Sequence, residues 1–290
     1  MAKLELHNGY PLWHYLPSMP AAIAFIIIFS LLTLGHAFRM FRHRVWFGIP
    51  MVVGGVFEIV GYVGRAIAHD NTGELMPYVI QSTLLLLAPI LFAASLYMTL
   101  SRVVVAVQGQ EHSPIATRWL TRIFVSGDVF SFIVQASGAG LRVQAGSADS
   151  DIDPNLGSNI IVGGLIFQII IFAVYIITII IFNRRFRRDS NATSRAIDVP
   201  WQQTLHMLYI TSTLVMIRNI FRVAEYVMGS DGYLLSVEWG VYVFDASLMA
   251  LTMALYFWWY PRKIKQALRS RHVVASTEDE SEMVDRKPMV

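Results

Sequence analysis

Apolar stretches of about 20 residues recur along the whole chain, and their length restricts what the chain can fold into. A helix of that length spans the ~30 Å hydrocarbon core of a bilayer and satisfies every backbone polar group within its own segment. The sequence predicts seven such helices, at residues 19–38, 46–68, 78–105, 119–141, 159–182, 203–228 and 236–260. We therefore expect an all-α, polytopic membrane protein with a seven-transmembrane-helix bundle.

These helices divide the chain into three parts: a segment before the bundle at 1–18, a transmembrane domain at 19–260 and a tail at 261–290. The first segment lacks the basic start and small-residue cleavage site of a signal peptide, so we expect it to be an extracellular segment. Trp13 and Tyr15 are expected at the membrane interface, where aromatic side chains are enriched.

The charges of the predicted loops indicate an orientation. Arginines gather in the first, third and fifth connections, whereas the connections between these carry acidic residues. Because an excess of Lys and Arg marks the cytoplasmic side, the N-terminus is predicted outside and the C-terminus in the cytoplasm. The loop arginines are Arg39, Arg42, Arg44, Arg102, Arg118, Arg122, Arg184, Arg185, Arg187, Arg188 and Arg195.

The second predicted helix carries a glutamate and an arginine within its apolar sequence. At about 100° per residue, Glu58, Tyr62 and Arg65 lie on one helical face. A charge at the bilayer centre costs at least ~2.5 kcal/mol, so it normally faces the protein interior and has a partner. Glu58 and Arg65 are about 10 Å apart along the helix axis, so each is expected to find its partner on another helix.

Other predicted helices carry similar polar stripes. Asp128, Ser131 and Gln135 follow i, i+3, i+7 spacing; Arg218, Arg222 and Glu225 follow i, i+4, i+7 spacing, as do Glu238, Tyr242 and Asp245. In the predicted orientation these residues and Gln81 lie between the midplane and the outer leaflet. The charges of this layer are nearly balanced. It contains four carboxylates, Glu58, Asp128, Glu225 and Asp245, and three arginines, Arg65, Arg218 and Arg222.

This layer has two interpretations. Buried ion pairs and hydrogen bonds can simply hold helices together, and Arg222 with Glu225 fits that interpretation best because the two are three residues apart on one helix. A bundle needs only a few such locks, however, so seven charges in one layer favour a hydrated cavity or a site for a polar headgroup.

Composition argues against several other classes of protein. The chain has no cysteine, and no lysine occurs between Lys3 and Lys263, so disulfides, thiolate metal sites and a retinal Schiff base are excluded. His36 and His206 are the histidines within predicted helices, and no His pair has metal-ligand spacing. The net charge of +3 does not indicate a nucleic-acid partner. We expect no enzymatic activity, no metal and no cofactor.

The stripes resemble the fungal RTA-like family of lipid-translocating exporters. The resemblance rests on Glu58-x-x-Gly61-Tyr62-x-x-Arg65, on Asp128-x-x-Ser131-x-x-x-Gln135 and on Arg218-x-x-x-Arg222-x-x-Glu225. It implies a fungal seven-helix protein of the plasma membrane that moves amphipathic lipids or confers resistance to membrane-active compounds. The family includes sphingoid-base exporters, aminosterol-resistance proteins and a porphyrin transporter.

The leading hypothesis is a translocase for cationic amphipathic lipids, because a buried ammonium headgroup demands a counter-charge. Glu58, Asp128 and Asp245 would bind the headgroup or exchange protons. The alternative is a seven-helix lipid sensor or receptor-like protein that passes a signal on without transport. The remaining predicted site residues are Gln81, Gln135 and Tyr62 as polar members, and Arg65, Arg218, Arg222 and Glu225 as counter-charges.

Overall fold

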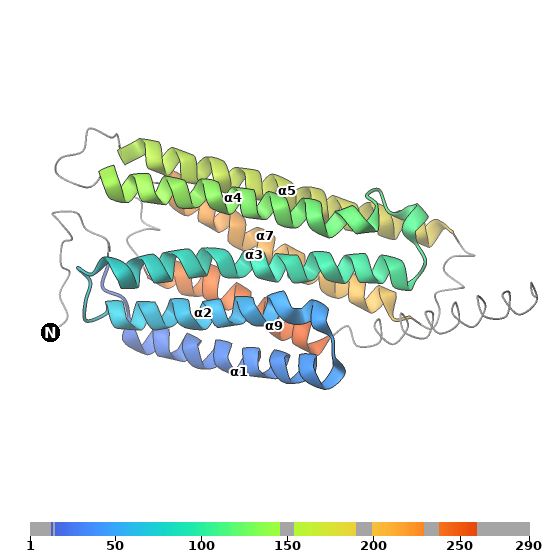
Figure 1. Ribbon diagram of the computed structural model, residues 1–290, viewed down its shortest axis with the longest axis horizontal. Coiled ribbons are helices and arrows are strands. Elements are labelled where there is room, and N and C mark those ends of the chain that lie inside the picture. The colour runs from blue at the N-terminus through green and yellow to red at the C-terminus, as the bar shows by residue number, and fades with distance from the viewer. Residues whose placement is uncertain (1–12, 14, 146–153, 190–198, 229–237, 260–290) are drawn as a thin grey trace, which may run out of the picture.

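The computed structural model describes residues 13, 15–145, 154–189, 199–228 and 238–259, and their helices form an elongated bundle (Figure 1). Seven helices are long and apolar enough to cross a membrane, which confirms the predicted fold class. The long helices are α1 (Met19–His43), α2 (Ile49–Ala68), α3 (Leu75–Ala106), α4 (Thr117–Ala145), α5 (Pro154–Arg188), α7 (Trp201–Val227) and α9 (Ser247–Trp258). The 3₁₀ turn η1 (Trp46–Gly48) precedes α2, η2 (Gln110–His112) precedes α4, and the π-helical segment η3 (Val241–Ala246) leads into α9.

Several helices extend beyond their predicted bounds. The helix predicted at 159–182 runs from Pro154 to Arg188, with Arg185, Arg187 and Arg188 in its last turn. Cations at a helix C-terminus interact favourably with the helix dipole, so this helix continues past the apolar stretch. The ends of the seventh predicted helix at 236, 237 and 260 lie outside the described residues, as do the acidic connections at 149–153 and 231.

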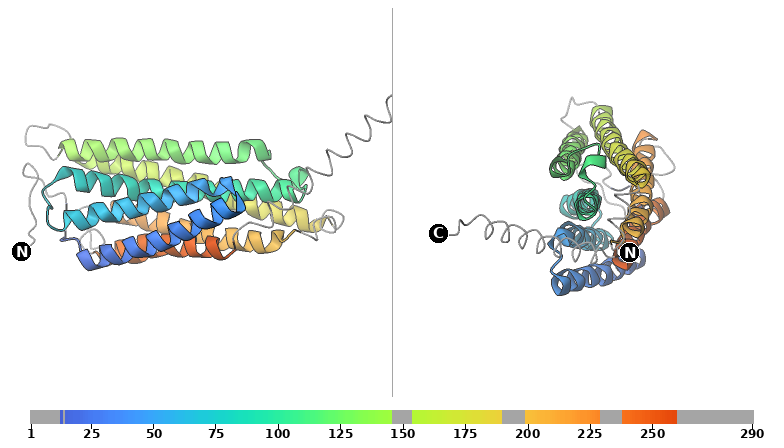
Figure 2. Two further views of the ribbon diagram at one scale, coloured as in Figure 1. Left: turned by 60° about the horizontal axis from the view of Figure 1, so that its bottom comes forward. Right: turned by 90° about the vertical axis from the view of Figure 1, so that its right-hand side faces the viewer.

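The helices pack in two rows, visible end-on in Figure 2. One row contains α1, α2, α3 and α4 in that order, and the other contains α5, α7 and α9. The rows meet where α4 contacts α5, α3 contacts α7 and α1 contacts α9. Helix α1 exposes large apolar side chains such as Leu31 and Leu34, each 67% exposed, as expected for a helix surface that faces lipid.

Glycine permits close approach where two neighbouring helices pack tightly. A Cβ atom at Gly54 of α2 would lie 2.7 Å from the Phe92 ring of α3, and one at Gly138 of α4 would lie 2.8 Å from the Gly157 carbonyl oxygen of α5. Small residues at such contacts let helix backbones approach each other in a membrane.

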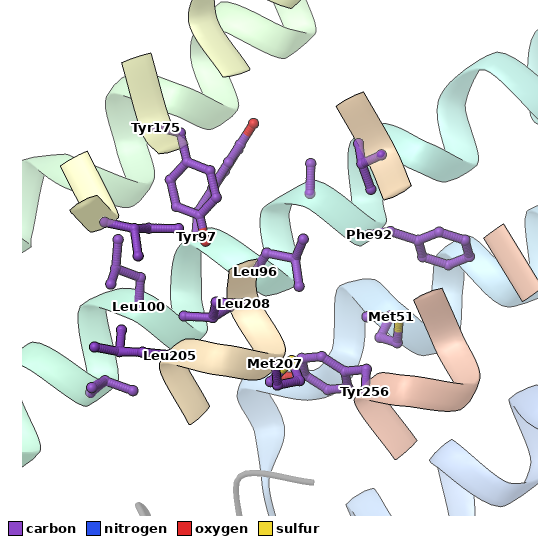
Figure 3. Close-up of a cluster of buried hydrophobic side chains, with 14 of the residues drawn as sticks. Met51, Phe92, Leu96, Tyr97, Leu100, Tyr175, Leu205, Met207, Leu208 and Tyr256 are labelled. Carbon is purple, nitrogen blue, oxygen red and sulfur yellow. The ribbon is translucent and has the colours of Figure 1, made fainter. Parts of the chain in front are cut away.

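Helix α3 lies at the centre of the apolar core. Its side chains Phe92, Leu96, Tyr97 and Leu100 are fully or almost fully buried between the two rows. Figure 3 shows Tyr97 beside Tyr175 of α5, and their ring centroids are 4.5 Å apart in an edge-on arrangement. The core thus joins α3 to the second row at mid-length.

The last membrane helix begins as a π-helix, although its sequence predicts α-helical spacing from Glu238 to Asp245. The wide turn spans Val241–Ala246, and the Ser247 hydroxyl donates a hydrogen bond of 2.8 Å to the Tyr242 carbonyl oxygen five residues earlier. A π-turn of this kind often occurs at functional sites.

Candidate functional site

Arg218 and Arg222 of α7 converge on one carboxylate of the last helix. The Arg218 Nε donates to Asp245 Oδ1 at 2.5 Å, and Arg222 forms an ion pair with the other oxygen of Asp245. Arg222 also pairs with Glu225 at 3.0 Å, and Arg218 donates to the backbone carbonyl oxygen of Leu85 at 3.0 Å. This cluster therefore ties α7 to η3 and to α3, and both Arg218 and Asp245 are buried.

Arg65 forms a second polar cluster toward the end of the bundle where α1 begins, which we call the Met19 end. Its guanidinium donates to Glu238 at 2.8 Å, to the Tyr15 hydroxyl at 2.9 Å and to the Tyr242 hydroxyl at 3.0 Å. A longer contact of 3.5 Å reaches Gln81 Oε1 of α3. Arg65 is 1% exposed, so it joins α2 to the last helix and to the segment before α1 from within the bundle.

Glu58 lies one helical turn before Tyr62 on the same face of α2, and it is 2% exposed. The charged groups of Asp245, Arg218 and Arg222 are near enough to act on it electrostatically. Among the residues that the structure describes, none forms a hydrogen bond or an ion pair with its carboxyl group. Glu58 is thus a buried acid beside an ion-pair cluster that already has its own carboxylates.

Asp128 of α4 is a second buried acid without a cation. Its Oδ2 accepts a 2.8 Å hydrogen bond from the Tyr97 hydroxyl of α3, whereas Oδ1 has no partner within the described part of the chain. Tyr97 is itself held by Phe124, Phe172 and Tyr175, whose ring centroids lie 4.5 to 6.1 Å from its own. Asp128 is therefore placed by a tyrosine and not by an arginine.

Gln135 lies apart from the charged residues, in the contact between α4 and α5. Its amide donates to Ser131 Oγ at 2.8 Å and to Gln168 Oε1 at 3.1 Å. Ser131 in turn donates to the Gly164 carbonyl oxygen at 2.6 Å. These bonds hold α4 and α5 together. This stripe therefore fits the interpretation in which buried polar residues join helices.

Tyr62 belongs to an aromatic stack between α1, α2 and the last helix. Its ring stacks on Phe25, Phe29 and Tyr242 at centroid distances of 5.6, 5.8 and 6.1 Å. Its buried hydroxyl has no hydrogen-bond partner in the described residues. Tyr62 therefore lies next to both Glu58, on its own helix face, and the Arg65 cluster.

The structure divides the predicted polar layer by how its charges are satisfied. The three arginines of the layer are matched by three carboxylates. Glu238, which belongs to a predicted stripe but not to the predicted charge balance, pairs with Arg65. Glu58 and Asp128 remain as the two carboxyl groups without a cationic partner in the described residues. The layer thus has two acids in excess, not one.

Some partners were not among the predicted site residues. Tyr242 was part of a predicted stripe, so the sequence indicated it, whereas Tyr97 lay in none of the three stripes. Tyr15 carried none, because an aromatic residue before a first membrane helix is typical of the interface, and its bond to Arg65 depends on how the chain folds back.

The two histidines within predicted helices lie in different surroundings. His36 is buried, and its imidazole Nε2 lies 3.0 Å from the Met253 carbonyl oxygen, so it belongs to the contact between α1 and α9. His206 is exposed. No group of three or more potential ligands occurs in the described ranges.

Comparison with known proteins identifies the family. Residues 51–267 match the family described as RTA1 like protein. The chain belongs to the RTA1-like family. It is 34% identical over 281 residues to protoporphyrin uptake protein 1 of Saccharomyces cerevisiae, an alignment that covers 85% of this chain and 90% of that protein.

Two further RTA1-like relatives come from the same organism. Protein RTM1 is 37% identical over 227 residues, covering 78% of this chain and 71% of its own. A sphingoid long-chain base transporter, RSB1, is 26% identical over 273 residues, covering 81% of this chain and 69% of its own. No solved structure matches the chain. Family membership and seven spanning helices together make this a multi-pass membrane protein of a fungal type.

Proposed function

We propose that this RTA1-like protein translocates amphipathic lipids with a cationic headgroup, such as sphingoid long-chain bases or aminosterols, across the fungal plasma membrane. The observation that carries the proposal is the pair of buried carboxyl groups, Glu58 and Asp128, that lack a cation among the described residues. Such transport would contribute to resistance against membrane-active compounds. The name of one relative, a sphingoid long-chain base transporter, supports this substrate class.

The physical basis is the cost of an unpaired buried charge. An ionised carboxylate in a low-dielectric interior is strongly unfavourable unless it gains a proton or a counter-ion. A lipid ammonium group supplies that counter-ion, and its departure returns the site to the protonated form. Glu58 and Asp128 would therefore exchange protons for headgroups, whereas Asp245 is already held by Arg218 and Arg222. We accordingly assign Asp245 to the framework of the site and no longer to headgroup binding.

The test is transport by purified protein in liposomes. We expect the wild type to move phytosphingosine between leaflets, and Glu58→Gln and Asp128→Asn to abolish that movement while the protein remains folded. Matched controls are Glu111→Gln and Asp70→Asn, which make the same chemical changes at exposed positions. Unchanged movement in both buried variants would refute the proposal.

The same experiment separates transport from sensing. A lipid sensor would bind the sphingoid base without moving it, so saturable binding with no change in leaflet distribution would favour the receptor-like alternative. Movement of the lipid by the purified protein alone would favour the translocase.

A further inference from the structure

A crevice of about 280 Å³ opens on the flank of the bundle between α3 and α4, at the Met19 end. Val79, one of its lining residues, is 40% exposed, so the crevice faces the surroundings of the bundle. Ile161 of α5 and Tyr226 of α7 form its inner wall. The separation of α3 from α4 at this end is visible in Figure 1.

The length of the crevice matches one leaflet of a bilayer. On α4 its lining runs from Arg142 down to Phe132, which are ten residues and therefore about 15 Å apart along the axis. On α3 it runs from Leu75 to Leu86, a similar rise. Half of a ~30 Å hydrocarbon core is about 15 Å, so the crevice extends from the interface to the midplane.

The chemistry of the lining changes along that length. Arg142, in the last turn of α4, contributes a positive charge at the Met19 end, and no carboxylate in the described residues pairs with it. Thr83 and Tyr226 add hydroxyl groups. Toward the midplane the lining consists of apolar side chains such as Leu86, Phe132 and Ala136.

The position of Arg142 is fixed by close helix packing. A Cβ atom at Gly157 of α5 would lie 2.9 Å from the Arg142 backbone nitrogen, so the two backbones are in contact there. The start of the arginine side chain is thereby held against the second row of helices at the mouth of the crevice.

We propose that this crevice binds one anionic phospholipid, with the phosphate on Arg142 and one acyl chain between α3 and α4. A guanidinium presents paired donors that match phosphate oxygens, and the hydroxyl groups nearby can add further hydrogen bonds. The volume of about 280 Å³ lies just below the ~300–1,000 Å³ typical of small-molecule sites, which suits one acyl chain. This site differs in charge from the Glu58 and Asp128 site and does not depend on transport.

The site would also place a lipid chain directly above one of the unpaired acids. Phe132 at the inner end of the crevice is four residues from Asp128, one turn away on the same face of α4. A bound phospholipid would therefore lie over Asp128 and its partner Tyr97.

Native mass spectrometry of the purified full chain with phosphatidylglycerol and phosphatidylcholine tests the proposal. We expect the wild type to retain one phosphatidylglycerol in preference to phosphatidylcholine. Arg142→Gln should weaken retention about tenfold, as for the loss of a hydrogen bond between charged groups. Ala136→Phe, which fills the apolar part, should reduce retention of both lipids.

Arg122→Gln is the matched control, because it removes an exposed arginine from the opposite end of the same helix. Each variant is first checked for an unchanged melting temperature. Equal retention of phosphatidylglycerol by wild type, Arg142→Gln and Ala136→Phe would overturn the proposal, as would equal retention of the two lipids by the wild type. Neither result would bear on the movement of phytosphingosine, so this site and the proposed transport fail independently.

Discussion

Asp245 accepts a hydrogen bond from the Arg218 Nε at 2.5 Å and also pairs with Arg222, so one carboxylate bridges two guanidinium groups of the neighbouring helix. Asp128, by contrast, accepts a hydrogen bond from the Tyr97 hydroxyl and pairs with no arginine in the described residues. These two aspartates are equally buried, yet one is part of an ion-pair cluster and the other is not. This contrast underlies our proposal that Asp245 is structural and Asp128 takes part in transport.

Replacing Asp245 by Asn should destabilise the fold, because it leaves the buried Arg218 without a carboxylate and Arg222 with only Glu225. Removing one partner of a buried ion pair costs about 3–5 kcal/mol. Asp128→Asn keeps the shape of the side chain, and no arginine loses a carboxylate partner. The free energy of unfolding should therefore change by less than about 1 kcal/mol. Thermal unfolding in detergent, followed by tryptophan fluorescence, measures both. Similar melting temperatures for the two variants would contradict this assignment.

Arg65→Lys should weaken the Met19 end of the bundle even though the charge is kept. An ammonium group has three donors and lacks the planar guanidinium fork, so it cannot serve Glu238, Tyr15 and Tyr242 in the same geometry. We expect a loss of about 1–3 kcal/mol in stability. Arg118→Lys, at an exposed position, is the control and should leave the melting temperature unchanged.

Two adjacent glycines of α5 should respond differently to alanine. A Cβ atom at Gly164 would lie 2.8 Å from Gln135 Cγ and 3.2 Å from the Ser131 carbonyl oxygen, whereas one at Gly163 meets nothing within 4 Å. Gly164→Ala should therefore cost about 1–3 kcal/mol through overpacking, and Gly163→Ala should be neutral or slightly stabilising. The same thermal assay compares them. Equal effects would mean that α4 and α5 pack less closely than described.

The predicted orientation can be tested with single cysteines, because the chain has none of its own. Asn71→Cys lies in the connection between α2 and α3, and Glu111→Cys lies in η2 between α3 and α4; both positions are exposed. With the N-terminus outside, a membrane-impermeant maleimide should label Asn71→Cys in intact cells and Glu111→Cys only after permeabilisation. The reverse pattern would invert the topology.

The helical architecture was predictable because membrane-spanning helices are defined by length and apolarity alone. Which charges pair was less predictable. Arg222 and Glu225 are three apart on one helix, so their ion pair could be expected, whereas Arg65 and Glu238 meet only through the packing of distant helices. Periodicity placed Glu58 and Asp128 on inward faces. It could not show that no arginine is left to pair with either of them. The crevice beside Arg142 depends on how far α3 and α4 diverge, which no local pattern records.

The π-helical segment Val241–Ala246 determines which changes of length the last helix can accept. Loss of one residue there would restore α-helical winding and rotate the part before it by about 100° relative to the part after it. Glu238 and Asp245 could then no longer reach Arg65 and Arg218 at the same time. Natural variants of this helix should therefore differ from one another by substitution and keep its residue count.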